Sequence, residues 1–498
     1  MSSIGVTLAD YANQPLNGFG QQGQNVLGTS SAGDVANLAK AISAGDTTGR
    51  DTTGLTNASG APLKVESLEA SLKYLTYKMR DIRLYPLLPK SAAFNTVEEY
   101  NQVVSFGNDG GGFIPEGGLP DTEDSVYRRL AQHVKFMGNV REVTHPMTLT
   151  RTQAEVGSII ERETQAGIMW LLKKVNHALA YADSNIVPDE FNGIYAQHRA
   201  AALNVNDYHA QETVIDMRGS HITQEVVMDA VDTVIDNHGY ASQLIGSHKT
   251  MSDISKQFLQ APYGGKRMEN NVTGATVGQR VNSIAVQNGD IGLNFDKFLT
   301  AGAAKTTATA ATSSNAPSNP TLATAAVASD AQSVFEAADA GDYLYAVTSL
   351  NRFGESGLGA ATAVTVAAGG AVDLTLTNGG GGNAPTGYQV YRTKKNDTGA
   401  GAKFYPLYKV STADVAAGYD GGAATVIRDK NRWLPDTNQA WMFDNDRDVI
   451  EVKQLAPMMK MDLALLSTSY RFMVLNYLTP ILYTPNKTIR FINVGKFA

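Results

Sequence analysis

The clearest candidate for a metal site in the sequence is the acidic run DNDRD at 444–448, which resembles the start of a calcium-binding loop. Such a loop needs glycine at its sixth position for a sharp turn and a carboxylate at its twelfth position to complete the coordination. Val449 and Leu455 occupy these two positions here. The sequence therefore predicts no calcium site in this segment.

The other patterns that could carry catalysis are incomplete. The chain has no cysteine, which excludes disulfides, thiolate nucleophiles and zinc sites with sulfur ligands. It has no GxxxxGK[ST] phosphate loop and no GxSxG nucleophile turn, and its eight histidines show no HExxH spacing. GLGAAT at 357–362 follows a turn among predicted strands, and His177 fits a packed or interface residue on a helix. We predict no enzyme activity, no cofactor and no metal.

Composition limits the classes of partner. The 498 residues carry a net charge of −7. A mildly acidic chain is a poor general binder of nucleic acid, although this net charge does not exclude a local basic patch. Only 18% of the residues are charged, which suggests a large buried surface, such as one between subunits. The sequence contains no run of 18 apolar residues, so it predicts no membrane-spanning helix. The first residues lack the pattern of a secretory signal. An intracellular product is the simplest expectation.

The longest helical pattern runs from Thr150 to Asp183. A capping box at Thr152 and Glu155 would begin this helix by satisfying free amides of its first turn. Such a length spans a large domain or reaches a neighbouring subunit. The apolar positions recur at three- and four-residue steps: Ile168, Leu171, Leu172, Val175, Ala178, Leu179 and Ala182.

Residues 97–149 predict a long two-stranded excursion that precedes this helix. Its tip at 107–124, GNDGGGFIPEGGLPDTED, is rich in glycine and acidic residues. A loop of this length is unusual inside a compact domain, so it is either functional or ordered by another chain. The acidic residues of the tip either face solvent or meet Lys and Arg of a neighbour, and both interpretations remain open.

The flanking segments differ in composition. Residues 1–63 are rich in Gly, Ser, Thr and Asn, which predicts a disordered tail or an arm that orders on a neighbour. Residues 64–83 predict a helix that the prolines of LYPLLPK stop. Residues 221–300 predict α/β structure, with helices in HITQEVVMDAVDTVIDNHG and KTMSDISKQFLQ and a short strand in SQLIGSH.

The composition changes at about residue 301. A low-complexity linker, AGAAKTTATAATSSNAPSNPTLATAAVA, precedes strands separated by turns every 8–12 residues or so, which is typical of a β-sandwich. After Trp433 the composition again resembles that of the residues before 301. We therefore predict that 301–432 is an inserted domain.

The order of these parts resembles the major capsid protein of tailed bacteriophages, which has the Hong Kong 97 type fold. The resemblance lies in a flexible arm, a long excursion, a long helix ending in ALAYADSNIVPDEFNGIY, an α/β domain and the strand-rich end YRFMVLNYLTPILYTPNKTIRFINVG. It implies an α+β fold with an inserted all-β sandwich. The implied boundaries are an N-terminal arm (1–63), a peripheral domain with a spine helix (64–96 and 147–185), an extended loop (97–146), an axial domain (186–300 and 433–475), the insertion (301–432) and C-terminal strands of either domain (476–498).

The resemblance also implies partners. Copies of the chain would form pentamers and hexamers of a virion shell around double-stranded DNA bound without sequence reading, with no membrane, after synthesis in the host cytoplasm. A separate scaffolding protein, a portal and a decoration or cement protein are possible partners. Some family members form a covalent cross-link between a lysine of the extended loop and another subunit. The tip at 107–124 has no lysine, so we do not expect this cross-link here. The residues expected at contacts between subunits are Phe113, Ile114, Glu116, Asp121, Glu123, Asp124, Arg128, Arg129, Lys173 and Lys174.

The insertion is similar to immunoglobulin or fibronectin type III domains in Tyr343-x-Tyr345-x-Val347 and in the GYxVYR run at 387–392. These strands occur in the reverse of the usual fibronectin order, which favours a permuted or merely immunoglobulin-like sandwich. A surface adhesin with this module is the alternative function, and it would normally show a secretion signal or repeated sandwiches. An enzyme with a β-sandwich accessory domain is a third, and it would need a site that the sequence does not reveal.

Overall fold

The computed structural model describes residues 76–107, 113–119, 122–150, 158–202, 213–260, 269–271, 274–276, 281–287, 289–300, 302–464 and 467–496. Within them the chain has the expected α+β class, and its parts follow the expected order. We call residues 302–432 the insertion and the other described residues the body. The predicted N-terminal arm lies outside the described residues. No described helix is long and apolar enough to cross a membrane.

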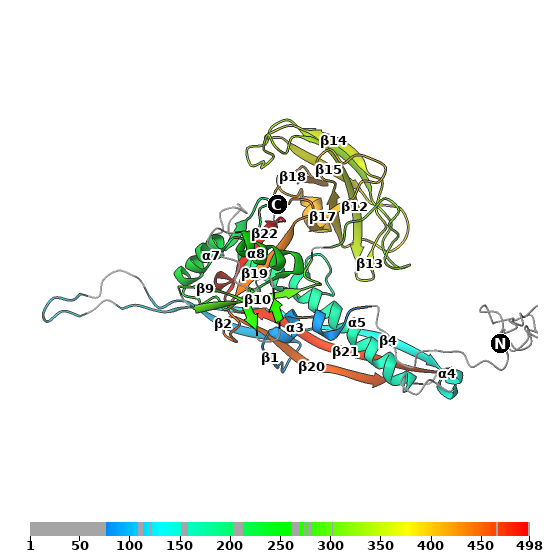
Figure 1. Ribbon diagram of the computed structural model, residues 1–498, viewed down its shortest axis with the longest axis horizontal. Helices are drawn as coiled ribbons and strands as arrows, with labels where there is room; N and C mark the ends of the chain where they lie inside the picture. Colours follow the sequence, from blue (N-terminus) through cyan, green and yellow to red (C-terminus); the bar gives the residue numbers. More distant parts are fainter. Residues whose placement is uncertain are drawn as a thin grey trace, which may run out of the picture. The chain divides into compact units, whose positions relative to one another are not determined.

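The long helix α5 (Ile159–Tyr181) lies along a four-stranded sheet, which we call the spine sheet (Figure 1). The sheet has the order β1 (Lys90–Ala92), β20 (Ile450–Asp462), β21 (Ser469–Leu482) and β4 (Lys135–Thr144). The predicted apolar stripe of α5 is confirmed, because Leu171, Val175 and Leu179 are fully buried. The helix ends two residues before the predicted Asp183, where Ala182 turns to extended backbone. The predicted capping box lies outside the described residues.

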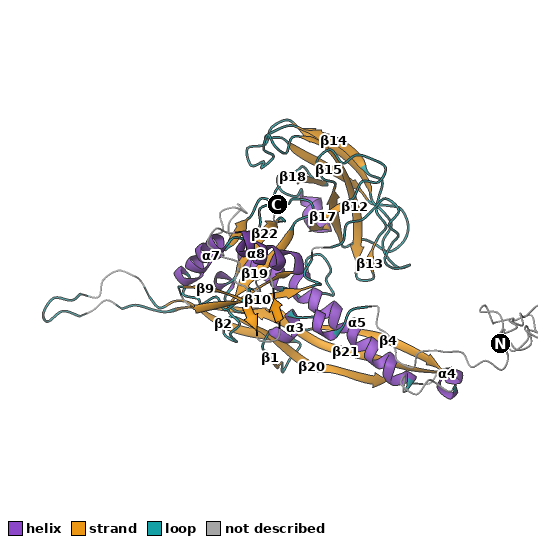
Figure 2. Ribbon diagram, viewed as in Figure 1, coloured by secondary structure: helices purple, strands orange, loops and turns teal. Residues whose placement is uncertain are grey.

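The excursion before α5 is shorter than predicted. β2 (Val97–Ser105) and β3 (Val126–His133) form an antiparallel hairpin (Figure 2). The rest of the predicted return arm is β4, which pairs with β21 from Lys135 to Thr144. The prediction of one two-stranded unit over 97–149 is therefore wrong beyond His133. Alternation identifies a strand but does not identify its partner.

The second sheet of the body has six strands and is packed against two helices. Its order is β5 (Val214–Asp216), β22 (Ile489–Val494), β19 (Asn438–Phe443), β6 (Gln243–Ser247), β10 (Gly289–Asp296) and β9 (Ser283–Val286). Helices α7 (Gln224–Asp236) and α8 (His248–Gln260) match the two predicted helices, and β6 matches the predicted short strand. Three short elements complete the body: α6 (Ile194–Ala202) and the pair β7 (Glu269–Asn271) and β8 (Gly274–Thr276).

The C-terminal strands are divided between the two sheets differently from the predicted boundary at 475. β20 and β21 lie in the spine sheet beside β4, whereas β19 and β22 lie in the six-stranded sheet. The boundary fails because the chain crosses twice between sheets, and strand composition alone does not show such crossings.

The segment before β1 corrects the helix predicted over 64–83. Residues 64–75 lie outside the described residues, and the remainder forms only a 3-10 turn at Met79–Asp81 and the short α3 (Leu84–Leu87). The buried Asp296 at the end of β10 accepts hydrogen bonds from the amides of Arg83 (2.8 Å) and Leu84 (3.1 Å). The side-chain amide of Asn176 on α5 donates to the same oxygen over 2.8 Å. These tertiary contacts override the local helical pattern.

The insertion folds as two sheets around a shared core. One has the order β11 (Thr321–Val327), β15 (Ala371–Thr377) and β18 (Val426–Asp429). The other contains β13 (Gly354–Glu355), β12 (Gly341–Asn351), β16 (Gly387–Arg392) and β17 (Tyr405–Ser411), with β14 (Thr362–Val366) also paired to β12. Apolar side chains of both sheets form one cluster.

The predicted series of strands after the linker is present, from β12 to β18. The predicted linker at 301–328 is not wholly a linker, because its last part is β11, which pairs along its length with β15. The short helix α9 (Thr412–Ala417) was not predicted. That the sandwich is of the immunoglobulin type stays a prediction.

Candidate interaction surface

The hairpin of β2 and β3 exposes apolar side chains that the described chain leaves uncovered. Phe106 is 88% exposed, Phe113 101% and Leu119 93%. Most of the exposed large hydrophobic side chains of the described residues lie between 94 and 149. Large exposed apolar patches are common at surfaces that bind another protein.

The exposure follows from the construction of the hairpin. Two strands without a covering layer leave both of their faces in solvent, and an isolated hairpin is only marginally stable. β2 is held to the residue that follows β21: the Tyr100 ring packs edge-on against Tyr483, with 5.0 Å between ring centres, and the Gln102 amide donates to the Tyr483 carbonyl. The burial of Tyr100 raises the pKa of its phenol. The hairpin is therefore anchored at one end.

The predicted basic residues of the hairpin bond mainly across its own strands. The Arg128 guanidinium donates to the Gln102 side-chain oxygen over 2.7 Å and 3.1 Å. Arg129 donates to Asn101 over 3.2 Å and lies 3.5 Å from a Glu99 carboxylate oxygen. Both arginines remain exposed, so these contacts stabilise little. They hold the two guanidinium groups in fixed positions on β3.

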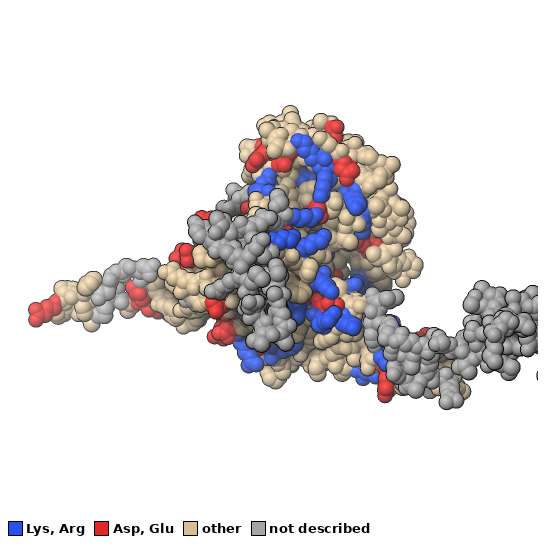
Figure 3. Space-filling model, in the orientation of Figure 1, with Lys and Arg blue, Asp and Glu red and all other residues tan. Residues whose placement is uncertain are grey.

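The predicted acidic residues lie at the tip. Glu116, Glu123 and Asp124 are exposed, while Asp121 lies outside the described residues. On the face shown in Figure 3, acidic side chains mark the outer part of the hairpin, whereas Lys and Arg gather over other parts of the molecule. Ile114 is 52% exposed beside Phe113. The tip thus combines apolar groups with negative charge.

The structure does not bring Lys173 and Lys174 to the hairpin. The Lys173 ammonium lies 5.3 Å from the Tyr77 ring centre and 5.2 Å from that of Phe298. The Lys174 ammonium lies 5.7 Å from the ring centre of Trp170. Both lysines of α5 therefore have cation–π partners within the chain. The ten predicted residues do not form one site.

A second exposed apolar region, which was not predicted from the sequence, lies on β4 and α4 (His145–Leu149). β4 is an edge strand of the spine sheet, and its Phe136 and Val140 are 60% and 61% exposed. Leu149 on α4 is 74% exposed. The spacing of Phe136 and Val140 on one face of a strand was the available signal, because a solvated face normally carries polar residues. An uncovered edge with apolar groups is a site for pairing with another chain.

Two histidines with strongly lowered pKa values are buried in the body. Burial lowers the pKa of His198 to about 3, and its Nε2 donates to the Thr488 carbonyl over 3.0 Å. Burial also lowers the pKa of His177 to about 4, and its ring packs against Tyr181. Neither imidazole faces a nucleophile. No group of three or more His, Asp or Glu residues in the described ranges is placed to hold a metal ion.

The chain resembles curated phage proteins over most of its length. It is 25% identical over 474 residues to the major capsid proteins of Staphylococcus phage K and Staphylococcus phage S25-3, covering 91% of this chain and 94% of each relative. It is 23% identical over 467 residues to the putative major capsid protein of Enterococcus phage phiEF24C, with the same coverage. No protein-family model matches the chain.

Among solved structures, the capsid of a native GTA particle aligns with a TM-score of 0.44 at 7% identity, covering 89% of this chain and 97% of that chain. A structure from Mycobacterium phage Ogopogo aligns with a TM-score of 0.42 at 6% identity, covering 87% and 97%. The sequence relationship, which spans more than nine-tenths of both chains, decides the assignment. By sequence, the chain is a homologue of bacteriophage major capsid proteins.

Proposed function

We propose that the chain is the major capsid subunit of a tailed bacteriophage. Many copies associate into pentamers and hexamers of an icosahedral shell that encloses double-stranded DNA. The observation that carries this proposal is the relationship to phage major capsid proteins over 91% of the chain. The part of the chain outside this match is shorter than the insertion, so the match extends into the insertion.

The exposed apolar hairpin supports self-association. A single chain leaves Phe106, Phe113 and Leu119 in water, and covering them with a second copy lowers the free energy. The hairpin would lie on an adjacent subunit, with Phe113 and Ile114 as apolar anchors. Stable interfaces bury on the order of 800 Å² per partner, which a hairpin of this length can supply together with its base.

Charge would orient that contact. Glu116, Asp121, Glu123 and Asp124 of the tip would face Lys or Arg of the neighbour, and Arg128 and Arg129 would face acidic groups. Such complementary pairs set the register and the rate of association more than the affinity. Lys173 and Lys174 would contribute through the surface of α5, with their cation–π contacts retained on one side.

The parts of the body take separate roles in this proposal. The spine sheet and α5 form the peripheral part of the subunit, and the six-stranded sheet with α7 and α8 forms the axial part around which five or six copies meet. β4 and α4 offer a second contact along the edge of the spine sheet. Residues 1–63 would be an arm that binds neighbouring subunits.

The proposed partners follow from the role. A separate scaffolding protein, a portal and a decoration or cement protein would act with the shell, and the DNA inside would be contacted without sequence reading. The subunit would be made in the host cytoplasm and would act without an enzymatic step. The insertion would be carried as a self-contained unit that the shell contacts do not require.

The experiment uses the absence of cysteine in the chain. Phe113→Cys introduces a single thiol at the tip, and Ala400→Cys introduces one at an exposed turn of the insertion. The full chain is produced with the scaffolding protein of its phage, shells are sought by electron microscopy, and maleimide labelling is compared between free subunits and shells. We expect the thiol at position 113 to be protected in shells and the thiol at position 400 to react in both states.

Two results would overturn parts of this proposal. A chain that stays monomeric and forms no shells contradicts the capsid function. Shells in which the thiol at position 113 reacts as fast as in free subunits retain the function and exclude the hairpin tip as a contact.

A further inference from the structure

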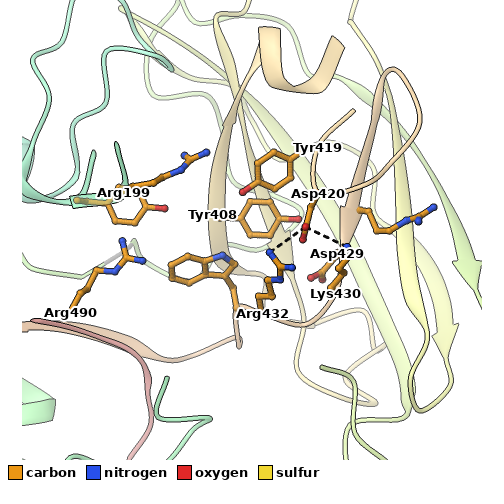
Figure 4. A pocket seen from close by; sticks show the side chains of 11 residues that line it. Arg199, Tyr408, Tyr419, Asp420, Asp429, Lys430, Arg432 and Arg490 are labelled. Atoms are coloured by element: carbon orange, nitrogen blue, oxygen red, sulfur yellow. Dashed lines mark ion pairs between the residues drawn. The ribbon is translucent and has the colours of Figure 1, made fainter. Parts of the chain in front are cut away.

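A small cavity lies where α6 and β22 of the body meet β17 and β18 of the insertion, and its volume is about 70 Å³. Figure 4 shows Arg199 and Arg490 on one side of it and the rings of Tyr408 and Tyr419 on the other. Five of its lining residues carry positive charge, and two carry negative charge. They are Arg199, Arg428, Lys430, Arg432 and Arg490, with Asp420 and Asp429.

Arg490 is a buried cation of this lining, with only 2% of its surface exposed. Its Nε and Nη1 have no hydrogen-bond partner in the part of the chain that the structure describes. Its guanidinium carbon lies 4.8 Å from the Tyr195 ring centre and 5.8 Å from that of Trp433. Cation–π contacts offset part of the desolvation cost, but they leave the N–H groups unsatisfied.

The acidic groups near the cavity are occupied by other cations. Asp420 lies 3.2 Å from Arg432 and 3.5 Å from Lys430. Asp429 lies 2.8 Å from the buried Arg392. These pairs leave the positive charge of Arg490 without a carboxylate partner among the described residues.

The side of the cavity near Arg490 is also rich in hydrogen-bond donors. Arg199 reaches it from α6, and its nearest carboxylate, Asp183, is 3.9 Å away. Figure 4 shows the Tyr419 hydroxyl on the side of its ring that faces Arg199 and Arg490. The Tyr408 hydroxyl, buried in the same lining, has no hydrogen-bond partner among the described residues. Burial raises the pKa of Tyr419 to about 12, so this phenol is a neutral donor at pH 7.

An anion fits this arrangement better than water alone. A buried guanidinium is stabilised when an opposite charge and hydrogen-bond acceptors reach it together. Water supplies acceptors without charge, whereas a tetrahedral oxyanion supplies both. A volume of about 70 Å³ is several times the roughly 10–15 Å³ that one water needs by the same measure, so a group of about five heavy atoms can be held.

We propose that this cavity binds a small tetrahedral oxyanion of the phosphate or sulfate class. The anion accepts hydrogen bonds from Arg490 and Arg199 of the body and from Tyr419 of the insertion, and so joins the two parts. On the described chain the insertion is also held directly, because Arg218 of the body donates to the Val334 and Asn431 carbonyls over 2.8 Å and 2.9 Å. The anion adds a second attachment at the cavity. This inference rests on its own geometry and does not depend on the proposed function.

The test measures phosphate binding by the folded full-length chain at pH 7. Isothermal titration gives the dissociation constant, and thermal unfolding in potassium phosphate is compared with potassium chloride of equal ionic strength. We expect a saturable rise in Tm with phosphate, because a ligand that binds only the folded state stabilises it in proportion to its occupancy. Sulfate should compete with phosphate for the site, and nitrate, which is planar, should compete poorly.

Arg490→Gln removes the unpaired charge, and we expect it to weaken phosphate binding at least about tenfold. Arg352→Gln is the matched control, since it removes the same charge from an exposed position on the insertion whose pair with Asp189 is 3.8 Å long. This control should bind phosphate as the parent chain does. Without phosphate, Arg490→Gln should keep or raise the Tm, because no partner loses its charge.

The proposal is overturned if the parent chain shows no saturable phosphate effect beyond that of chloride. It is also overturned if Arg490→Gln and Arg352→Gln respond to phosphate alike. Should Arg490→Gln fail to fold, Tyr419→Phe serves instead, because it deletes one hydroxyl and keeps every charge. Binding several-fold weaker in Tyr419→Phe supports the site, and unchanged binding removes Tyr419 from it and with it the proposed attachment of the insertion.

Discussion

The insertion and the hairpin of β2 and β3 differ in how far they bury their side chains. The insertion buries a charged pair in its interior: Arg392 is 1% exposed, lies 2.8 Å from Asp429 and donates to the Asn431 side chain over 2.7 Å. The Tyr345 hydroxyl donates to the same carboxylate over 2.7 Å. The hairpin, by contrast, leaves Phe113 fully exposed. One region buries its apolar and charged groups, in a core that Trp433 and Ile492 of the body complete, and the other leaves apolar side chains in solvent.

This difference separates folding from assembly within a single chain. A buried ion-pair network makes a region sensitive to substitution, because losing one partner leaves a charge without compensation. An uncovered two-stranded hairpin contributes little to the stability of its own chain, so its residues are free to serve an interface. Three substitutions and one change of pH test this difference, and the substitutions are ordered from the largest expected change in folding free energy to the smallest.

Arg392→Met should destabilise the insertion by about 3–5 kcal/mol, because it leaves Asp429 buried without its cation. The measurement is differential scanning calorimetry of the full chain together with limited proteolysis of the insertion. Arg352→Met, at an exposed position, is the control and should change the Tm little. Equal behaviour of the two variants would show that the insertion does not depend on its buried ion pair.

Val175→Pro should cost at least about 3 kcal/mol, since proline removes a helical hydrogen bond and clashes with the preceding turn of α5. Because α5 packs on the spine sheet that carries β4, shells should be lost as well. Ala400→Pro, at an exposed turn of the insertion, should leave shells intact. Electron microscopy of both preparations decides the point, and similar shell yields would mean that α5 does not organise the subunit.

Stability should fall between pH 6.5 and pH 4 in the body rather than in the insertion. Burial lowers the pKa of His198 to about 3 and that of His177 to about 4, while both titrate near 6.5 in the unfolded chain. In this window the unfolded state binds protons that the folded state does not, so each histidine lowers the free energy of unfolding by up to about 1.4 kcal/mol per pH unit as the pH falls.

The insertion carries no histidine, since none follows His248. Urea unfolding at pH 7, 6 and 5 measures how the free energy of unfolding depends on pH. His198→Gln should reduce the slope of this dependence by the contribution of one titrating histidine. A slope that the substitution does not alter would show that His198 is protonated in the folded state.

Phe113→Ser should change the folding free energy by no more than about 0.5 kcal/mol, because the ring touches little of its own chain. It should nevertheless reduce shell yield strongly. Phe353→Ser is the matched control on the insertion, where the ring is 42% exposed, and its shells should form normally. If both substitutions leave shell yield unchanged, the exposed tip of the hairpin is not an assembly contact.

Local pattern predicted the elements better than their partners. The regular spacing of turns predicted the strands of the insertion, and the three- and four-residue spacing predicted the buried stripe of α5. These signals depend on neighbouring residues only. The helix predicted over 64–83 failed in its described part because Asp296, more than two hundred residues away, binds the Arg83 and Leu84 amides.

The candidate surface was predicted in part. The glycine-rich tip and its apolar residues Phe113 and Ile114 were recognisable from composition. The surface on β4 and α4 was missed because its exposure depends on β4 being an edge strand, and the cation–π partners of Lys173 and Lys174 depend on the approach of distant segments.

The sequence by itself determined the order of parts, the position of the insertion and the resemblance to phage capsid subunits, because composition and periodicity are properties of short segments. Only the tertiary structure decided which sheet each C-terminal strand joins, because strand pairing depends on contacts between distant segments. The same reason applies to the cavity at Arg490. Its charge is read directly from the sequence, but whether a carboxylate reaches a buried guanidinium is settled only when α6, β22 and the insertion come together.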